Sequence, residues 1–114
     1  TNATSQNLDL ITFAEFLLVG NFDFSSCNNG SSFSIAPYSE IVPEAGSLIN
    51  CSSQFPLAVL GCSDAARHMT ISYNTVERAT EGNHTELFFN TQVIVANGTV
   101  LARYRKYHVF YTKC

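Results

Sequence analysis

Charge is scarce in this sequence, and a surplus of positive charge is missing. Charged residues fill 13% of the 114 positions, with 6 basic and 9 acidic side chains and a net charge of −3. Ordinary soluble domains carry roughly 25% charged residues. A nucleic-acid binder needs an excess of lysine and arginine to neutralise phosphates, so this composition excludes a strongly basic protein of that class.

Long apolar runs are missing as well. About 18 consecutive apolar residues are needed to span a bilayer, and the longest run here, residues 13–19, is interrupted by Glu15. We therefore expect no transmembrane segment. A leader peptide is not visible, which predicts a mature or processed segment. The hydrophobic share of 46% is sufficient for the core of one domain of this length.

Acceptor sites for N-linked glycans, in contrast, are in excess. The pattern Asn-X-Ser/Thr occurs five times, whereas this composition would give roughly two by chance. Glycans would supply the solubility that the sparse charge does not. The sites predict a secreted, extracellular glycoprotein. The five acceptors are Asn2, Asn29, Asn50, Asn83 and Asn97.

The four cysteines agree with an oxidising compartment. They are Cys27, Cys51, Cys62 and Cys114, and three pairings into two disulfides are open. Cys51 and Cys62 close the shortest loop and are the simplest local pair. Cys114 is the last residue, so a bond to another chain is an alternative. The absence of Cys-X-X-Cys spacing argues against a zinc ribbon or a thioredoxin-like site; four buried, reduced thiols are the remaining reading.

The spacing of apolar residues and the positions of proline, glycine and small polar residues predict the order of the helices and strands. Residues 7–13 are typical of a short buried strand, and residues 20–34 of a long loop. A helical turn or two fits within residues 37–49. A helix is predicted over residues 54–68, with Ser52-Ser53 as its N-cap and Pro56 in its first turn, although Gly61 disfavours it. Residues 69–76 have the β-branched and aromatic composition of a strand.

The clearest local pattern is a β-hairpin. Residues 87–96 and 99–108 flank Asn97-Gly98, a dipeptide that supplies the two positive φ angles of a type I′ turn. Strict alternation along the second arm places Val100, Ala102 and Tyr104 on one face, and Leu101, Arg103 and Arg105 on the other. The whole order of elements predicts a mixed α/β layer architecture.

Several of these segments resemble a known family. Residues 89–95 (FNTQVIV) and 97–110 (NGTVLARYRKYHVF) are similar to the "YNT-x-VV" strand, NG turn and "L-x-x-RYRK" arm of the vanin and biotinidase branch of the nitrilase superfamily. Residues 9–15 (DLITFAE) resemble that family's "D-x-IVFPE" strand, and residues 20–22 its following loop. Residues 62–76 resemble the helix and strand between these motifs, so the resemblance covers nearly the whole chain.

The resemblance implies an αββα sandwich that hydrolyses non-peptide carbon–nitrogen bonds with a Glu, a Lys and a Cys. In this chemistry a carboxylate takes the thiol proton, because only the thiolate attacks an amide well. A lysine ammonium stabilises the oxyanion that forms. Glu15 matches the base and Lys106 matches the oxyanion-stabilising lysine. Without the family, each reads equally well as a solvent-exposed charge.

The nucleophile has no match in this chain. In the family it lies a few tens of residues beyond the lysine, whereas Cys114 follows Lys106 by only eight positions. Ala14 stands where the family has Pro, and Phe16 where it usually has Asp, so the surroundings of Glu15 are altered. We therefore expect a vestigial or incomplete site. We also expect residues 1–114 to be one partial nitrilase-like domain, without its first strand and nucleophile-bearing part, completed by companion chains.

Two functions from different classes follow. One is a non-catalytic, vanin-like glycoprotein chain that binds or stores a small molecule or serves structure, with 14 aromatic residues compatible with a small apolar ligand. The alternative is an amidohydrolase, pantetheinase-like or biotinidase-like, whose Cys nucleophile lies on a partner chain. Neither requires a cofactor. His68, His84 and His108 lack metal-ligand spacing, so no metal site is expected.

Overall fold

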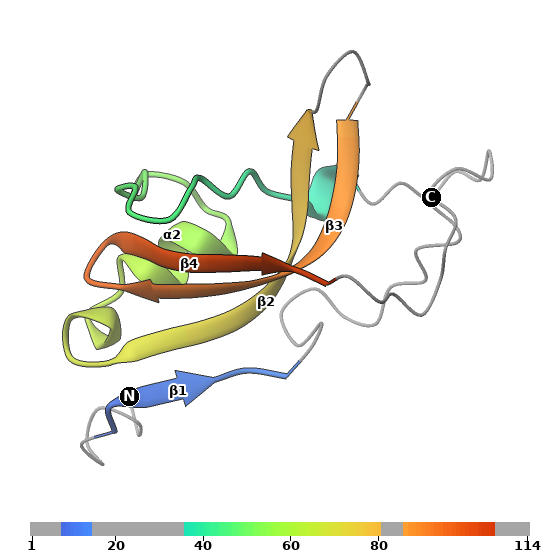
Figure 1. Cartoon of the computed structure of the whole chain (residues 1–114). Coiled ribbons are helices and arrows are strands. Elements are labelled where there is room, and N and C mark those ends of the chain that lie inside the picture. The colour runs from blue at the N-terminus through green and yellow to red at the C-terminus, as the bar shows by residue number, and fades with distance from the viewer. Residues whose placement is uncertain (1–7, 15–35, 81–85, 107–114) are drawn as a thin grey trace.

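A four-stranded mixed sheet organises the part of the chain that the computed structural model describes, residues 8–14, 36–80 and 86–106. The strands lie in the order β1-β2-β3-β4 (Figure 1). β1 is parallel to β2, whereas β3 is antiparallel to both of its neighbours. The strands are β1 (Leu10–Thr12), β2 (Thr70–Thr80), β3 (Glu86–Ala96) and β4 (Thr99–Arg105).

The helical part is small. It consists of α2 (Pro56–Gly61) and two 3₁₀ turns, η2 (Ala36–Tyr38) and η3 (Ala65–Arg67). A mixed sheet with little helix agrees with the predicted mixture of strands and helices, while the αββα sandwich remains a prediction. Within the described residues, no helix is long and apolar enough to cross a bilayer.

The strands predicted from the sequence are present. β1 lies within residues 7–13, but the prediction that it is buried is wrong, because Leu10 and Thr12 are exposed at the edge of the sheet. β2 begins at Thr70 and continues beyond the predicted end to Thr80. The hairpin of β3 and β4 is confirmed, because Asn97 and Gly98 have φ of 51° and 73°, as a type I′ turn requires. The loop predicted over residues 20–34 lies outside the described residues.

The helix predicted over residues 54–68 is too long. Helix α2 ends at Gly61, and Cys62 follows as its C-cap, with its N–H on the carbonyl of Ala58. The N-cap is Phe55; the Ser53 hydroxyl instead accepts a hydrogen bond from the Phe55 N–H. Pro56 does lie in the first turn, as predicted. Gly61 and the disulfide at Cys62 explain the early end, because one weakens the helix and the other fixes the turn after it.

The described cysteines form one of the predicted disulfides. Cys51 and Cys62 are bonded, with their Cα atoms 5.8 Å apart. Cys27 and Cys114 lie outside the described residues. A disulfide between two residues of the chain is consistent with a secreted protein.

Residues 39–49 form a strap across one face of the sheet. The predicted helical turn is limited to η2, and the rest of the segment is mostly extended. Glu40 pairs with the edge of β2, where its N–H donates to the Val76 carbonyl at 2.9 Å. Further on, the N–H of Gly46 donates to the carbonyl of Val100 in β4 at 2.7 Å. The strap therefore connects β2 to the opposite edge of the sheet.

The core lies between this sheet face and the strap with α2. Tyr73 of β2 and Val93 of β3 are fully buried at its centre. Leu57 and Ala58 cover it from α2, and Val42 covers it from the strap. The remaining buried apolar residues of the cluster are Ile49, Ala66, Met69, Ile71, Val95 and Val100.

A β-bulge changes the phase of β4. Ile94 pairs with Ala102 and Val95 pairs with Val100, which leaves Leu101 as an extra residue in β4. The strict alternation predicted for this arm is therefore wrong. Val100 is fully buried on the core face, and Arg103 and Arg105, opposite Val93 and Thr91, return to that same face.

Candidate functional site

Lys106, the predicted oxyanion-stabilising residue, follows β4 directly. It is half-buried, and its backbone N–H donates to the Asn90 carbonyl at 2.7 Å. β1 and β4 run in the same direction, so their C-terminal ends lie at one end of the sheet (Figure 1). The other predicted catalytic residue, Glu15, lies outside the described residues.

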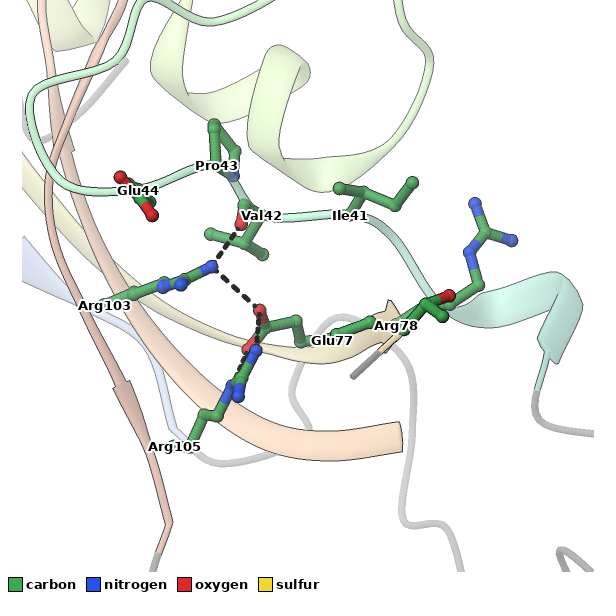
Figure 2. Close-up of a pocket in the computed structure, with 10 residues that line it drawn as sticks. Ile41, Val42, Pro43, Glu44, Glu77, Arg78, Arg103 and Arg105 are labelled. Atoms are coloured by element: carbon green, nitrogen blue, oxygen red, sulfur yellow. Dashed lines mark hydrogen bonds and ion pairs between the residues drawn. The ribbon is translucent and has the colours of Figure 1, made fainter. Parts of the chain in front are cut away.

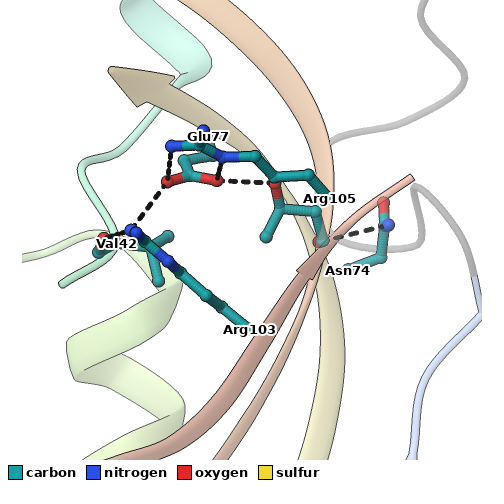
Figure 3. Close-up of polar contacts among 6 residues, drawn as sticks. Val42, Asn74, Glu77, Arg103 and Arg105 are labelled. Carbon is teal, nitrogen blue, oxygen red and sulfur yellow. Dashed lines mark hydrogen bonds and ion pairs between the residues drawn. The ribbon is translucent and has the colours of Figure 1, made fainter. Parts of the chain in front are cut away.

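A buried ion cluster that the sequence analysis missed lies on the core face. The Glu77 side chain is 1% exposed and accepts from two arginines of β4 (Figure 3). Arg105 binds both carboxylate oxygens, with Nε 3.0 Å from Oε1 and Nη2 3.1 Å from Oε2. The Thr91 hydroxyl donates to Oε1 at 2.8 Å. The described contacts of this carboxylate are therefore charge-assisted hydrogen bonds from two arginines and one hydrogen bond from a hydroxyl.

The cluster also holds the strap in place. Nη1 of Arg103 donates to Oε2 of Glu77 at 3.1 Å and to the Val42 carbonyl at 2.6 Å. Arg105 stacks on the Phe89 ring, with its guanidinium carbon 4.0 Å from the ring centre. Two guanidinium groups thus share one carboxylate.

A hollow of about 520 Å³ opens beside this cluster, between the strap and the ends of β2 and β4 (Figure 2). We call it the arginine hollow. Its volume is within the range of small-molecule sites, about 300–1,000 Å³. The residues that line it are Ile41, Val42, Pro43, Glu44, Glu77, Arg78, Ala79, Thr80, Arg103 and Arg105.

A second buried carboxylate links the strap to α2. Glu40 is 3% exposed; its Oε1 accepts from the Leu57 N–H at 3.0 Å, in the first turn of α2. Its Oε2 accepts from the hydroxyls of Thr75 at 2.6 Å and Tyr73 at 3.4 Å. Burial raises the pKa of Glu40, and the three hydrogen bonds only partly offset that rise. Burial, and next the charge of Glu40, raise the pKa of Tyr73.

These groups do not form a nucleophile with its base. A thiol nucleophile needs a free sulfur next to a carboxylate or imidazole. Both cysteines in the described ranges are joined in a disulfide, and both buried carboxylates have hydrogen-bond partners on each oxygen. The described residues also contain no cluster of three or more His, Cys, Asp or Glu that could hold a metal ion. His84 and His108 lie outside the described residues.

One pattern in the sequence points to part of this cluster. Ile71, Tyr73, Thr75 and Glu77 alternate along β2 and all face the core. A glutamate that continues a buried alternation needs a cationic partner. No local pattern identifies that partner, because the bulge at Leu101 decides the side on which Arg103 and Arg105 lie.

Two predicted glycosylation sites lie near each other. Asn50 and Asn97 are exposed, and the N–H of Ile49 donates to the carbonyl of Gly98 at 2.9 Å, next to both. This is the end of β4 opposite to Lys106. Asn2, Asn29 and Asn83 lie outside the described residues. Glycosylation at all five sites remains a prediction.

Comparison with known protein-family models finds no match to this chain, and comparison with curated proteins finds none either. The resemblance to the vanin and biotinidase branch therefore depends on the sequence motifs alone. The function has to be argued from the geometry of the described residues.

Proposed function

We propose that this chain is part of a secreted glycoprotein in which a nitrilase-like fold binds a small molecule without catalysis. The observation that carries the proposal is the saturation of the buried charges. Glu77 is bound by two arginines, and Glu40 by the Leu57 N–H and two hydroxyls. Groups held in this way maintain the structure and shape a cavity rather than transfer protons.

The chemistry of amide hydrolysis supports the same conclusion. In the nitrilase-type mechanism, attack on an amide requires a thiol and a base with a lone pair free to take the thiol proton. In the described ranges, Cys51 and Cys62 are unavailable because they are bonded to each other. The arginine hollow, in contrast, has the size and the mixed polar and apolar wall of a binding site.

Secretion and a multi-chain assembly belong to the same proposal. The disulfide and the two exposed sequons fit passage through the secretory pathway. The proposal includes companion chains of the same precursor as partners of this chain in a nitrilase-like domain.

One observation favours the alternative, an amidohydrolase whose nucleophile lies on a companion chain. β1 and β4 end on the same side of the sheet, and Lys106 follows β4 there. A base following β1 would share that end of the sheet with Lys106. Hydrolysis would still require a thiol supplied from elsewhere.

An activity assay on the intact, native glycoprotein with its companion chains separates the two functions. Pantetheine and a biotinyl amide are the substrates to test, because the resemblance implies them. We expect no amine release above the uncatalysed rate. Hydrolysis that disappears in Lys106→Met and persists in Arg67→Met, an exposed control, would overturn the proposal. Hydrolysis at the same rate in both variants would also overturn the proposal if the activity co-purifies with the glycoprotein, and would come from a contaminant if it separates from it.

A further inference from the structure

The chemical class of the ligand follows from the arginine hollow. We infer that it binds a small organic acid, whose carboxylate pairs with Arg103 and whose aliphatic part lies along the strap. This inference rests on the non-catalytic binding role proposed above, and it names the ligand. It depends on three features of the hollow: an unused edge of a guanidinium, the local charge, and an apolar wall.

The unused edge belongs to Arg103. Both of its described hydrogen bonds, to Glu77 and to the Val42 carbonyl, use Nη1. No described residue accepts a hydrogen bond from its Nε or Nη2, which form the other edge of the guanidinium. Arg105 uses this same pair of nitrogens to bind both oxygens of Glu77. Arg103 therefore presents the two-donor edge that matches a carboxylate.

Arg103 is also held rigidly enough to act as an anchor. Its Nη1 is fixed between a buried carboxylate and a backbone carbonyl, and its side chain is 29% exposed. The free edge thus keeps access to solvent while its orientation is set by the protein. A donor pair that is already oriented loses less entropy when a ligand binds.

The charge of the hollow favours a monoanion. Three arginines, Arg78, Arg103 and Arg105, line it together with Glu44 and Glu77. Glu44 is exposed at the rim, whereas Glu77 is already paired. One carboxylate would pair with the Nε and Nη2 edge of Arg103. A doubly charged phosphate would leave a negative charge beside Glu44 and Glu77.

The apolar wall indicates the rest of the ligand. Ile41 and Pro43 of the strap and Ala79 of β2 line the same hollow as Arg103, and Ile41 is exposed. Burying apolar surface there is worth about 25 cal/mol per Å². The aliphatic chain of a short carboxylic acid fits this combination of one charged anchor and an apolar side. The neutral amide of the same acid would lack the charge-assisted pairing.

Titration of the native chain with butyrate tests the inference, with butyramide as the neutral control. We expect saturable butyrate binding by calorimetry and a shift of the Arg103 Nε–H resonance in ¹H–¹⁵N spectra. We expect butyramide to bind at least tenfold more weakly. Absence of saturable butyrate binding, equal binding of butyramide, or tighter binding of inorganic phosphate would each overturn the assignment.

Two variants locate the site. Arg103→Lys keeps the charge but removes the two-donor edge, so we expect butyrate affinity to fall at least tenfold. Arg67→Lys, at an exposed arginine of η3, is the matched control and should bind as the parent does. If Arg103→Lys fails to fold, the Arg103 Nε–H resonance of the parent is followed during the butyrate titration instead. A resonance that does not move would refute the site.

The outcome is distinguishable from that of the proposed function. Amide hydrolysis together with butyrate binding at Arg103 would remove only the non-catalytic role. If the protein shows no hydrolysis and no butyrate binding, only the organic-acid assignment is removed, and the non-catalytic role stands.

Discussion

Arg105 of β4 binds both carboxylate oxygens of Glu77 in β2 through Nε and Nη2, at 3.0 and 3.1 Å. Glu77→Gln would leave two arginines facing a neutral amide at the edge of the core. Breaking a buried ion pair costs about 3–5 kcal/mol, and the partial exposure of both arginines places the expected loss near the lower end, at about 3 kcal/mol. Urea unfolding followed by circular dichroism measures it.

The control for this prediction is Glu44→Gln. Glu44 lines the same hollow but is exposed, so its replacement should change the free energy of unfolding by less than about 0.5 kcal/mol. A Glu77→Gln variant within about 1 kcal/mol of the parent would show that the ion cluster contributes little to stability.

Glu40 should make stability depend on pH in the direction opposite to a salt-bridged carboxylate. Burial raises its pKa above the ordinary value of 4.5, so the folded chain binds this proton more tightly than the unfolded chain. Its stabilising contribution is therefore complete below pH 4.5 and is lost as pH rises through the folded pKa. Glu40→Gln removes this dependence, which amounts to at most about 1.4 kcal/mol per pH unit.

Urea unfolding of the parent and Glu40→Gln at several pH values from 4 to about 7.5 checks the sign. The free energy of unfolding of the parent should decline relative to that of the variant as pH rises. Glu44→Gln provides the matched exposed control. Parallel curves for the parent and Glu40→Gln would contradict the prediction.

Gly61 should be intolerant of a side chain although it ends a helix. A Cβ at this position would collide with Cδ1 of the buried Ile49 and touch Val95. Alanine raises helix propensity by about 1 kcal/mol, but overpacking costs about 1–3 kcal/mol. We expect Gly61→Ala to lower the free energy of unfolding.

A double-mutant cycle with Ile49→Val isolates the cause. Valine lacks Cδ1, and alone it should cost about 0.5–1.5 kcal/mol. Combined with Gly61→Ala, it should restore part of the loss, so the double variant would be more stable than the sum of the single effects. Additive losses would mean that the collision with Ile49 is not the reason.

Asn97 should carry a glycan when the chain is secreted by a eukaryotic cell. It is exposed at the tip of the β3–β4 hairpin, and Thr99 completes its sequon. Thr99→Val should abolish the glycan while keeping a β-branched residue at the start of β4. Thr99→Ser should retain it. Enzymatic deglycosylation followed by peptide mass spectrometry gives the occupancy, and an unmodified Asn97 in the parent would refute the prediction.

Local patterns predicted the elements whose geometry is decided locally. Asn97-Gly98 specifies its own turn, and the β-branched and aromatic composition of residues 69–76 specifies a strand. The helix over residues 54–68 was overestimated because its end depends on the disulfide from Cys62 to Cys51. The helical spacing of apolar residues in the sequence carries no information about that disulfide.

The arginine hollow depends on contacts between residues that are far apart in the sequence. Arg103 and its carbonyl partner Val42 are 61 residues apart, and the phase of Arg103 depends on one extra residue, Leu101, in β4. Glu40 reaches Thr75 and Leu57 only because the strap lies across the sheet. Charged residues near the ends of strands usually face solvent, so the sequence alone does not single out these side chains.

The strap has a consequence for how the sheet opens. The same short run of backbone is hydrogen-bonded to β2 through Glu40 and to β4 through Gly46. Fraying from either side must therefore release this run, which ties together the motions of two strands that are not neighbours. In hydrogen–deuterium exchange, the amides of Glu40 and Gly46 should consequently become labelled in a single opening event.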